Sequence, residues 1–102
     1  MNADTSTAAA TLGMRMAAAQ AGHREAYESL LVDSAALIRT TALACGVPMT
    51  AVDGIVEAAL TTVHKVRHTY DPAHSYLHWL DAIARRYVRK CLYSTRRHRP
   101  GD

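Results

Sequence analysis

Seven cationic side chains gather between residues 85 and 99, and no acid interrupts them. Placed on a helix, most of them form two neighbouring rows, the first made of Arg85, Arg89 and Arg96 and the second of Arg86, Lys90 and Arg97. Like charges four residues apart repel each other unless a polyanion offsets them. The pattern therefore favours binding of phosphate groups, and a solvated helix face with a basic tail is the alternative.

Aromatic residues gather just before these cations, around an Asp71-Pro72 turn. Tyr70, Tyr76 and Trp79 make up half of the six aromatic residues in the chain. A ring beside a cationic row can stack on an unpaired base, which is worth roughly 1 to 3 kcal/mol per base. Packing against the core is the alternative, and it is the favoured interpretation for Tyr76, which continues an apolar helical stripe.

Six histidines suggest metal binding, because His64 and His68, and again His74 and His78, are four residues apart. However, His64 and His68 enclose no general base, and the intervening Lys65 would repel a cation. We therefore expect no metal and no cofactor. The acids are scattered and no nucleophile motif or glycine-rich phosphate loop is present, so we expect a binding module that is not an enzyme.

Charge is distributed unevenly over the 102 residues. Residues 1–63 contain three basic and six acidic residues, whereas residues 64–102 contain nine basic and three acidic ones. This asymmetry favours nucleic acid as a partner of the C-terminal half. The sequence has no secretory signal and no membrane-spanning run, which predicts a cytoplasmic protein. Cys45 and Cys91 lie on apolar stripes without a CxxC spacing, so we expect reduced core thiols.

The elements that position these residues are helices. Residues 7–21 predict a short, weakly anchored helix of small side chains. A 3.6-residue apolar period then predicts a long helix that ends at Gly46-Val47-Pro48. The next helix opens at Thr50, which can cap it, and buries Val52, Ile55 and Val56 among others.

Ser75 caps the last predicted helix, which follows the Asp71-Pro72 break and continues past Leu92. No alternating pattern of a strand occurs. The sequence thus predicts an all-α fold, a small bundle of three main helices plus a short N-terminal helix. Residues 1–21 form a flexible or helical extension, residues 22–99 the domain, and residues 100–102 a tail.

Three segments resemble the second conserved region of extracytoplasmic-function bacterial sigma factors. Residues 22–27, GHREAY, resemble the family's entry to its first helix, and residues 53–57, DGIVE, stand where it has a DLVQE-type motif. Residues 67–73, RHTYDPA, followed by WL at 79–80 and IAR at 83–85, are similar to one branch of the family and form the most specific match. The resemblance covers roughly residues 22–99.

The family resemblance implies transcription initiation as the function. A domain of this type docks on the clamp helices of the largest subunit of RNA polymerase core, and it recognises and melts the promoter minus-ten element on the non-template strand. An anti-sigma factor is a further partner that it implies. The residues implied for polymerase binding are Asp53, Val56, Glu57 and Leu60. The residues implied for DNA binding are Tyr70, Asp71, His74, Tyr76, Trp79, Arg85, Arg86, Arg89, Lys90, Arg96 and Arg97.

Several positions depart from the family pattern. Gly54 and Val56 replace a larger apolar residue and a Gln in the docking motif, and Lys90 stands where Asp is common. His74 and Ser75 stand where the branch has Arg and Pro. Two alternatives therefore stay open. One is a sigma mimic that binds an anti-sigma factor or another regulator without binding a promoter, and the other is a nonspecific nucleic-acid binder.

Overall fold

Four α-helices and one 3-10 turn make up the described chain. The computed structural model describes the backbone of residues 2–97 and the side chains of residues 11–94. The helices are α1 (Asn2–Gln20), α2 (Arg24–Ala44), α3 (Met49–Val66) and α4 (Tyr76–Arg97), and the 3-10 turn η1 (Arg67–Thr69) follows α3. Residues 2–97 contain no strand, so the all-α prediction is confirmed.

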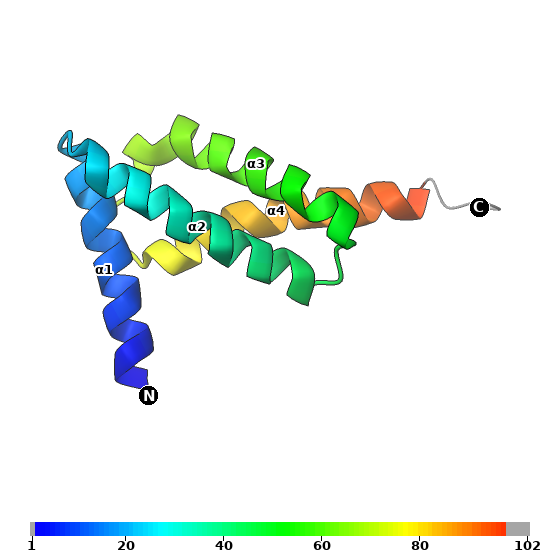
Figure 1. Ribbon diagram of the computed structural model, residues 1–102, viewed down its shortest axis with the longest axis horizontal. Helices are drawn as coiled ribbons and strands as arrows, with labels where there is room; N and C mark the ends of the chain where they lie inside the picture. Colours follow the sequence, from blue (N-terminus) through cyan, green and yellow to red (C-terminus); the bar gives the residue numbers. More distant parts are fainter. Residues whose placement is uncertain (1, 98–102) are drawn as a thin grey trace.

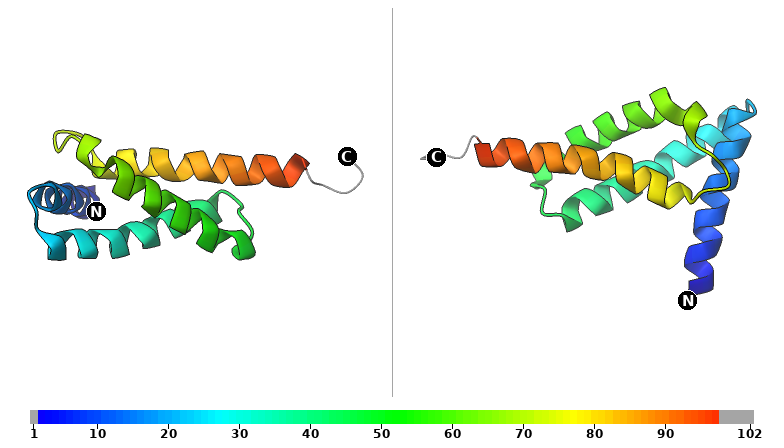
Figure 2. Two further views of the ribbon diagram at one scale, coloured as in Figure 1. Left: turned by 90° about the horizontal axis from the view of Figure 1, so that it is seen from above. Right: turned by 180° about the vertical axis from the view of Figure 1, so that it is seen from behind.

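The helices α2, α3 and α4 run along the long axis of the molecule, whereas α1 crosses them at one end (Figure 1). The principal extents are 51 × 32 × 20 Å. Helices α3 and α4 pack together and run in opposite directions. The last turns of α4 extend beyond the other helices in every view (Figures 1 and 2), and the first half of α1 extends away from them in Figure 1 and in the right view of Figure 2.

Two glycines end the first two helices. Gly22 has a φ of 102° and Gly46 a φ of 89°, which is the left-handed region that side chains with a Cβ rarely adopt. After each glycine the chain closes the helix with a backbone hydrogen bond, from the His23 amide to the Ala18 carbonyl and from the Val47 amide to the Ala42 carbonyl. The predicted stop at residues 46–48 is therefore confirmed.

The start of α3 differs from the prediction. The helix begins at Met49, with Pro48 as its N-cap, and no side chain caps it. Thr50 consequently lies inside the first turn, where it is exposed. The reason is that Pro48, with φ −58° and ψ 142°, is the last residue outside the helical region, and its carbonyl already accepts a 2.8 Å hydrogen bond from the Ala51 amide.

The N-terminal helix packs more closely than its small side chains indicated. It is 19 residues long, and Leu12 and Met16 are buried in the core, Met16 completely. Arg15 forms an ion pair with Asp33 on α2, with 2.6 Å between Nη1 and Oδ2. Two large apolar residues one turn apart and one ion pair therefore anchor the second half of α1.

Candidate nucleic-acid interface

The three aromatic residues around the turn form one cluster. The centroid of the Tyr70 ring lies 5.5 Å from that of the Tyr76 ring and 5.3 Å from that of the Trp79 ring. The ring centroids of Tyr76 and Trp79 are 5.6 Å apart. Tyr70 is only 3% exposed and Tyr76 is fully buried, whereas Trp79 is partly exposed. A base can therefore reach only Trp79. The core packing favoured for Tyr76 is therefore confirmed, whereas stacking of a base on Tyr70 is contradicted, because the core covers its ring; both residues can support Trp79.

Burial also affects the hydroxyl groups of the two tyrosines. The Tyr76 hydroxyl shares a 2.8 Å hydrogen bond with the buried hydroxyl of Ser34 on α2. Burial raises the pKa of Tyr76 to about 12, although the hydrogen bond with Ser34 lowers it. Burial also raises the pKa of Tyr70, with a contribution from the nearby Asp71 carboxylate. Both rings are therefore neutral structural elements at physiological pH.

The turn between η1 and α4 is held by its own polar groups. The Tyr70 hydroxyl donates to the His74 carbonyl (2.5 Å), and the Asp71 Oδ1 accepts from the Ala73 amide (2.9 Å). The Ser75 hydroxyl accepts from the His78 amide at the start of α4 (3.3 Å), as expected for its capping role. Asp71 and His74 remain exposed, with 3.4 Å between His74 Nδ1 and Asp71 Oδ2. Both are accessible to a ligand.

The cations of α4 are not equivalent. Arg85 is engaged by Asp81 one turn earlier, with 2.6 Å between Nε and Oδ2, and its Nη1 lies 3.7 Å from the Cys45 sulfur. The Asp81 hydrogen bond and charge raise the pKa of Arg85, so this guanidinium stays charged but is already paired. Arg85 therefore already has a partner on its own helix, and its predicted phosphate contact stays a prediction.

Arg86 and Arg89 are exposed, and neither forms an ion pair with any described side chain. Lys90 is exposed as well, and its ammonium lies 5.9 Å from the ring centroid of Tyr87. Arg96 and Arg97 belong to α4, but their side chains lie outside the described residues, as does Arg99. Three cations of the predicted set are therefore available on the described part of α4.

The four residues implied for polymerase docking lie on α3 but differ in exposure. Val56 is only 8% exposed and packs in the core, so its assignment to a docking surface is wrong. Asp53 is exposed but forms a 2.7 Å ion pair with Arg39 on α2. Glu57 is exposed and Leu60 is partly buried. Only Glu57 presents a described side chain that is both exposed and unpaired.

The histidines and cysteines do not form a metal site in the described part of the chain, where no group of three potential ligands comes together. His64 Nδ1 instead shares a 2.8 Å hydrogen bond with the Tyr27 hydroxyl. Cys45 and Cys91 are free, partly buried thiols. None of the helices described combines the length and the apolar character that crossing a membrane requires.

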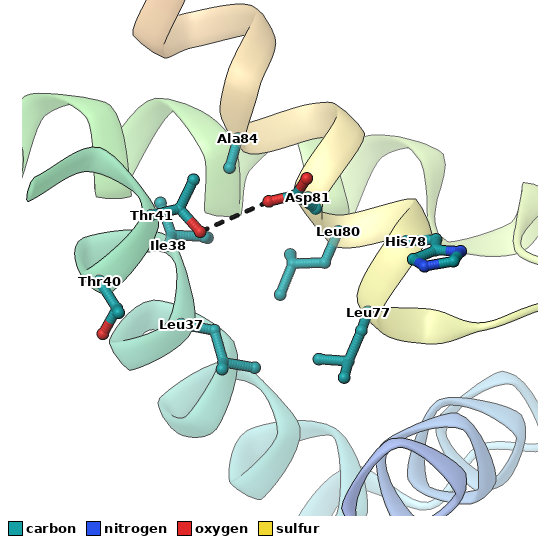
Figure 3. Close-up of a pocket in the computed structure, with 9 residues that line it drawn as sticks. All are labelled: Leu37, Ile38, Thr40, Thr41, Leu77, His78, Leu80, Asp81 and Ala84. Atoms are coloured by element: carbon teal, nitrogen blue, oxygen red, sulfur yellow. Dashed lines mark hydrogen bonds between the residues drawn. The ribbon is translucent and has the colours of Figure 1, made fainter. Parts of the chain in front are cut away.

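An apolar groove of about 240 Å³ lies between α2 and α4. Leu37, Leu77 and Leu80 line it, and at its polar end the Thr41 hydroxyl donates to the Asp81 carboxylate at 3.5 Å (Figure 3). No local sequence pattern predicts this groove, because its walls come from two helices about 40 residues apart. The pairing of Arg85 with Asp81, by contrast, has a local signal in the four-residue spacing of the two residues.

Comparison of the sequence with models of known protein families and with curated proteins finds no match, and comparison with solved structures finds none either.

Proposed function

We propose that the chain binds a single strand of promoter DNA along α4 and docks on RNA polymerase core through α3, as a sigma-factor domain does during promoter melting. One observation carries the proposal: Arg86 and Arg89 are exposed, and form no ion pair with a described side chain, on the helix that also presents Trp79. An opened strand offers both unpaired bases and phosphates, which these side chains match. The motif resemblance of residues 67–85 supports the same function.

The geometry of the cluster suits the holding of a flipped base. Extrusion of a base costs a few kcal/mol, so the stacking partner must already be in place. Tyr70 and Tyr76 pack against Trp79 and fix its ring, while the self-bonded turn keeps Asp71 and His74 exposed nearby. The turn and Trp79 therefore form the base-binding part of the proposed interface, and the cations of α4 form the phosphate-binding part.

The test is fluorescence anisotropy with labelled single strands, one containing a minus-ten-like sequence and one with the same bases scrambled, each measured at two salt concentrations. Trp79→Ala is expected to weaken binding by roughly 1 to 3 kcal/mol. Trp79→Phe is the matched control, because it keeps an aromatic ring in the cluster. For a single strand, Arg86→Ala and Arg89→Ala should each flatten the slope of log K against log salt by about 0.7. A folded parent protein that binds neither strand would refute the proposal.

Polymerase docking is tested separately, with a pull-down of bacterial RNA polymerase core on the immobilised chain. We expect Glu57→Arg to reduce capture, because Glu57 is exposed on α3 and reversal of its charge changes the proposed contact surface. Glu28→Arg makes the same charge change at an exposed site on α2 and serves as the control. Equal capture by both variants would contradict docking through α3.

A second candidate is a sigma mimic that binds a protein regulator without binding a promoter. The burial of Val56 and the ion pair between Asp53 and Arg39 favour it, because they remove two of the side chains implied for polymerase docking. A mimic would bind an anti-sigma factor or another regulatory protein and would ignore the labelled strand. The anisotropy measurement thus separates the two candidates.

A further inference from the structure

Lys65 is a cation near the end of α3 that the proposed interface does not yet use. Its side chain is exposed, and it forms no ion pair with the described side chains. Its neighbour His64 faces α2, where it bonds to Tyr27. Since consecutive helical residues are separated by about 100° around the axis, Lys65 belongs to a different face of α3.

That face borders α4. The hydroxyls of Thr62 and Tyr87 are hydrogen-bonded to each other and connect α3 to α4. The two helices lie side by side and run antiparallel (Figures 1 and 2). Lys65 lies three residues after Thr62, so it shares the Thr62 side of α3 and lies about 4.5 Å further along it. On α4, Lys90 lies three residues after Tyr87, and its ammonium is 5.9 Å from the Tyr87 ring.

Arg86 and Trp79 continue the row of Lys90 on α4, because they precede it by four and eleven residues. We call the solvent-facing boundary of α3 and α4, with Lys65 on one side and Trp79, Arg86 and Lys90 on the other, the α3–α4 seam. Cations therefore border the seam from both helices, and Trp79 lies at the end nearest the turn.

No described acid offsets these cations. Asp53 and Glu57, the acids of α3, are four residues apart in one row, and Asp53 of this row bonds to Arg39 on α2. The opposite border of α4 differs, because there Asp81 pairs with Arg85 beside Thr41 of α2 and Cys45, the C-cap of α2. The two borders of α4 thus differ in available charge, and the seam is the more cationic one.

The geometry points to the α3–α4 seam as the path of the phosphate backbone, with Lys65 as a phosphate-binding residue that the sequence motifs do not include. This inference rests on the proposed single-strand binding and specifies which border of α4 the strand follows. A strand whose base stacks on Trp79 places its following phosphates between Lys65 and the Arg86–Lys90 row. Arg85, on the far border, contributes little.

The test measures the salt dependence of binding for Lys65→Gln with a labelled single strand, by fluorescence anisotropy between 0.05 and 0.2 M salt. Loss of one phosphate contact is expected to flatten the slope of log K against log salt by about 0.7. If variant and parent bind equally at 1 M salt, a slope change of about 0.7 over a tenfold dilution of the salt gives about a fivefold lower affinity of the variant at 0.1 M salt. Arg24→Gln is the matched control, because Arg24 is an exposed cation on α2 with no ion pair among residues 11–94, and its replacement should leave the slope unchanged.

The outcomes separate this inference from the proposed function. A flatter slope for Lys65→Gln but not for Arg24→Gln supports the seam, and a double variant with Arg86→Gln should lose about twice as much slope. If Arg86→Gln weakens binding while Lys65→Gln matches the parent, the seam is wrong and the proposed function stands. If the parent binds no strand, both are overturned. Circular dichroism of each variant verifies that the fold is intact.

Discussion

The buried pair of Tyr76 and Ser34 makes the stability of the protein sensitive to alkaline pH. Burial raises the pKa of Tyr76 from 10.0 to about 12, so the folded protein holds this phenolic proton more tightly than the unfolded chain does. A group with a raised folded pKa stabilises the fold fully below its unfolded pKa. That contribution is lost as the pH rises from 10 towards 12.

The size of the loss follows from the two pKa values. Between pH 9 and pH 11 the unfolded tyrosine releases most of its proton and the folded one very little, which lowers the free energy of unfolding by about 1 kcal/mol. Tyr76→Phe removes this term. It also removes the hydrogen bond to Ser34, which should destabilise the variant at neutral pH by about 1 kcal/mol.

Urea unfolding followed by circular dichroism at pH 7, 9 and 11 measures both effects. Tyr27 and Tyr70, whose pKa values are also raised, remain in both proteins, so comparison of the variant with the parent isolates Tyr76. We expect the parent to be more stable at pH 7 and the difference to disappear or reverse at pH 11. Stability curves that stay parallel from pH 9 to pH 11 would refute the argument that burial controls the Tyr76 proton.

Two further predictions concern the fold. Met16→Ala should lower the free energy of unfolding by about 2 to 5 kcal/mol, because the Met16 side chain is fully buried. Met14→Ala, at a site that is 72% exposed, should change it by at most about 0.5 kcal/mol. Equal effects of the two substitutions would contradict the placement of α1. Gly46→Ala should destabilise by about 1 kcal/mol or more, because φ is 89°, whereas Gly54→Ala, in helix α3 with open space at the Cβ position, should stabilise by up to about 1 kcal/mol. Thermal unfolding checks this opposite pair of shifts, and shifts of the same sign would count against the turn geometry.

Local patterns predicted the helices well because each signal acts within a few residues. Gly46 and Pro48 end one helix and begin another through their own backbone preferences, and the Asp71-Pro72 break and the Ser75 cap act equally locally. The helical period of the apolar residues also predicted burial better than the resemblance to a family motif did. The apolar stripe placed Val56 in the core while the motif placed it on a docking surface, and burial agrees with the stripe.

The site was harder to predict because its properties depend on residues that are distant in sequence. The burial of Tyr70 results partly from α1, since a Cβ added at Gly13 would lie 3.0 Å from the Tyr70 hydroxyl. The role proposed for Lys65 depends on the contact between Thr62 and Tyr87, which pairs residues 25 positions apart. The amino-acid composition predicted that α4 is positively charged. The difference in available charge between its α2 side and its α3 side follows only from the packing of the neighbouring helices.

Helix α1, which lies outside the family resemblance, controls the shape of the proposed binding turn. The Gln20 side-chain amide donates to the carbonyls of Arg67 (3.0 Å) and Tyr70 (2.8 Å), the residues that lead into the turn. Met16 is fully buried one turn before Gln20, so its packing positions this amide. Because Tyr70 in turn contacts Trp79, a shift of α1 would move the ring on which a base is proposed to stack. The proposed binding of a base by residues 67–80 therefore depends on the packing of α1 as well as on the motif.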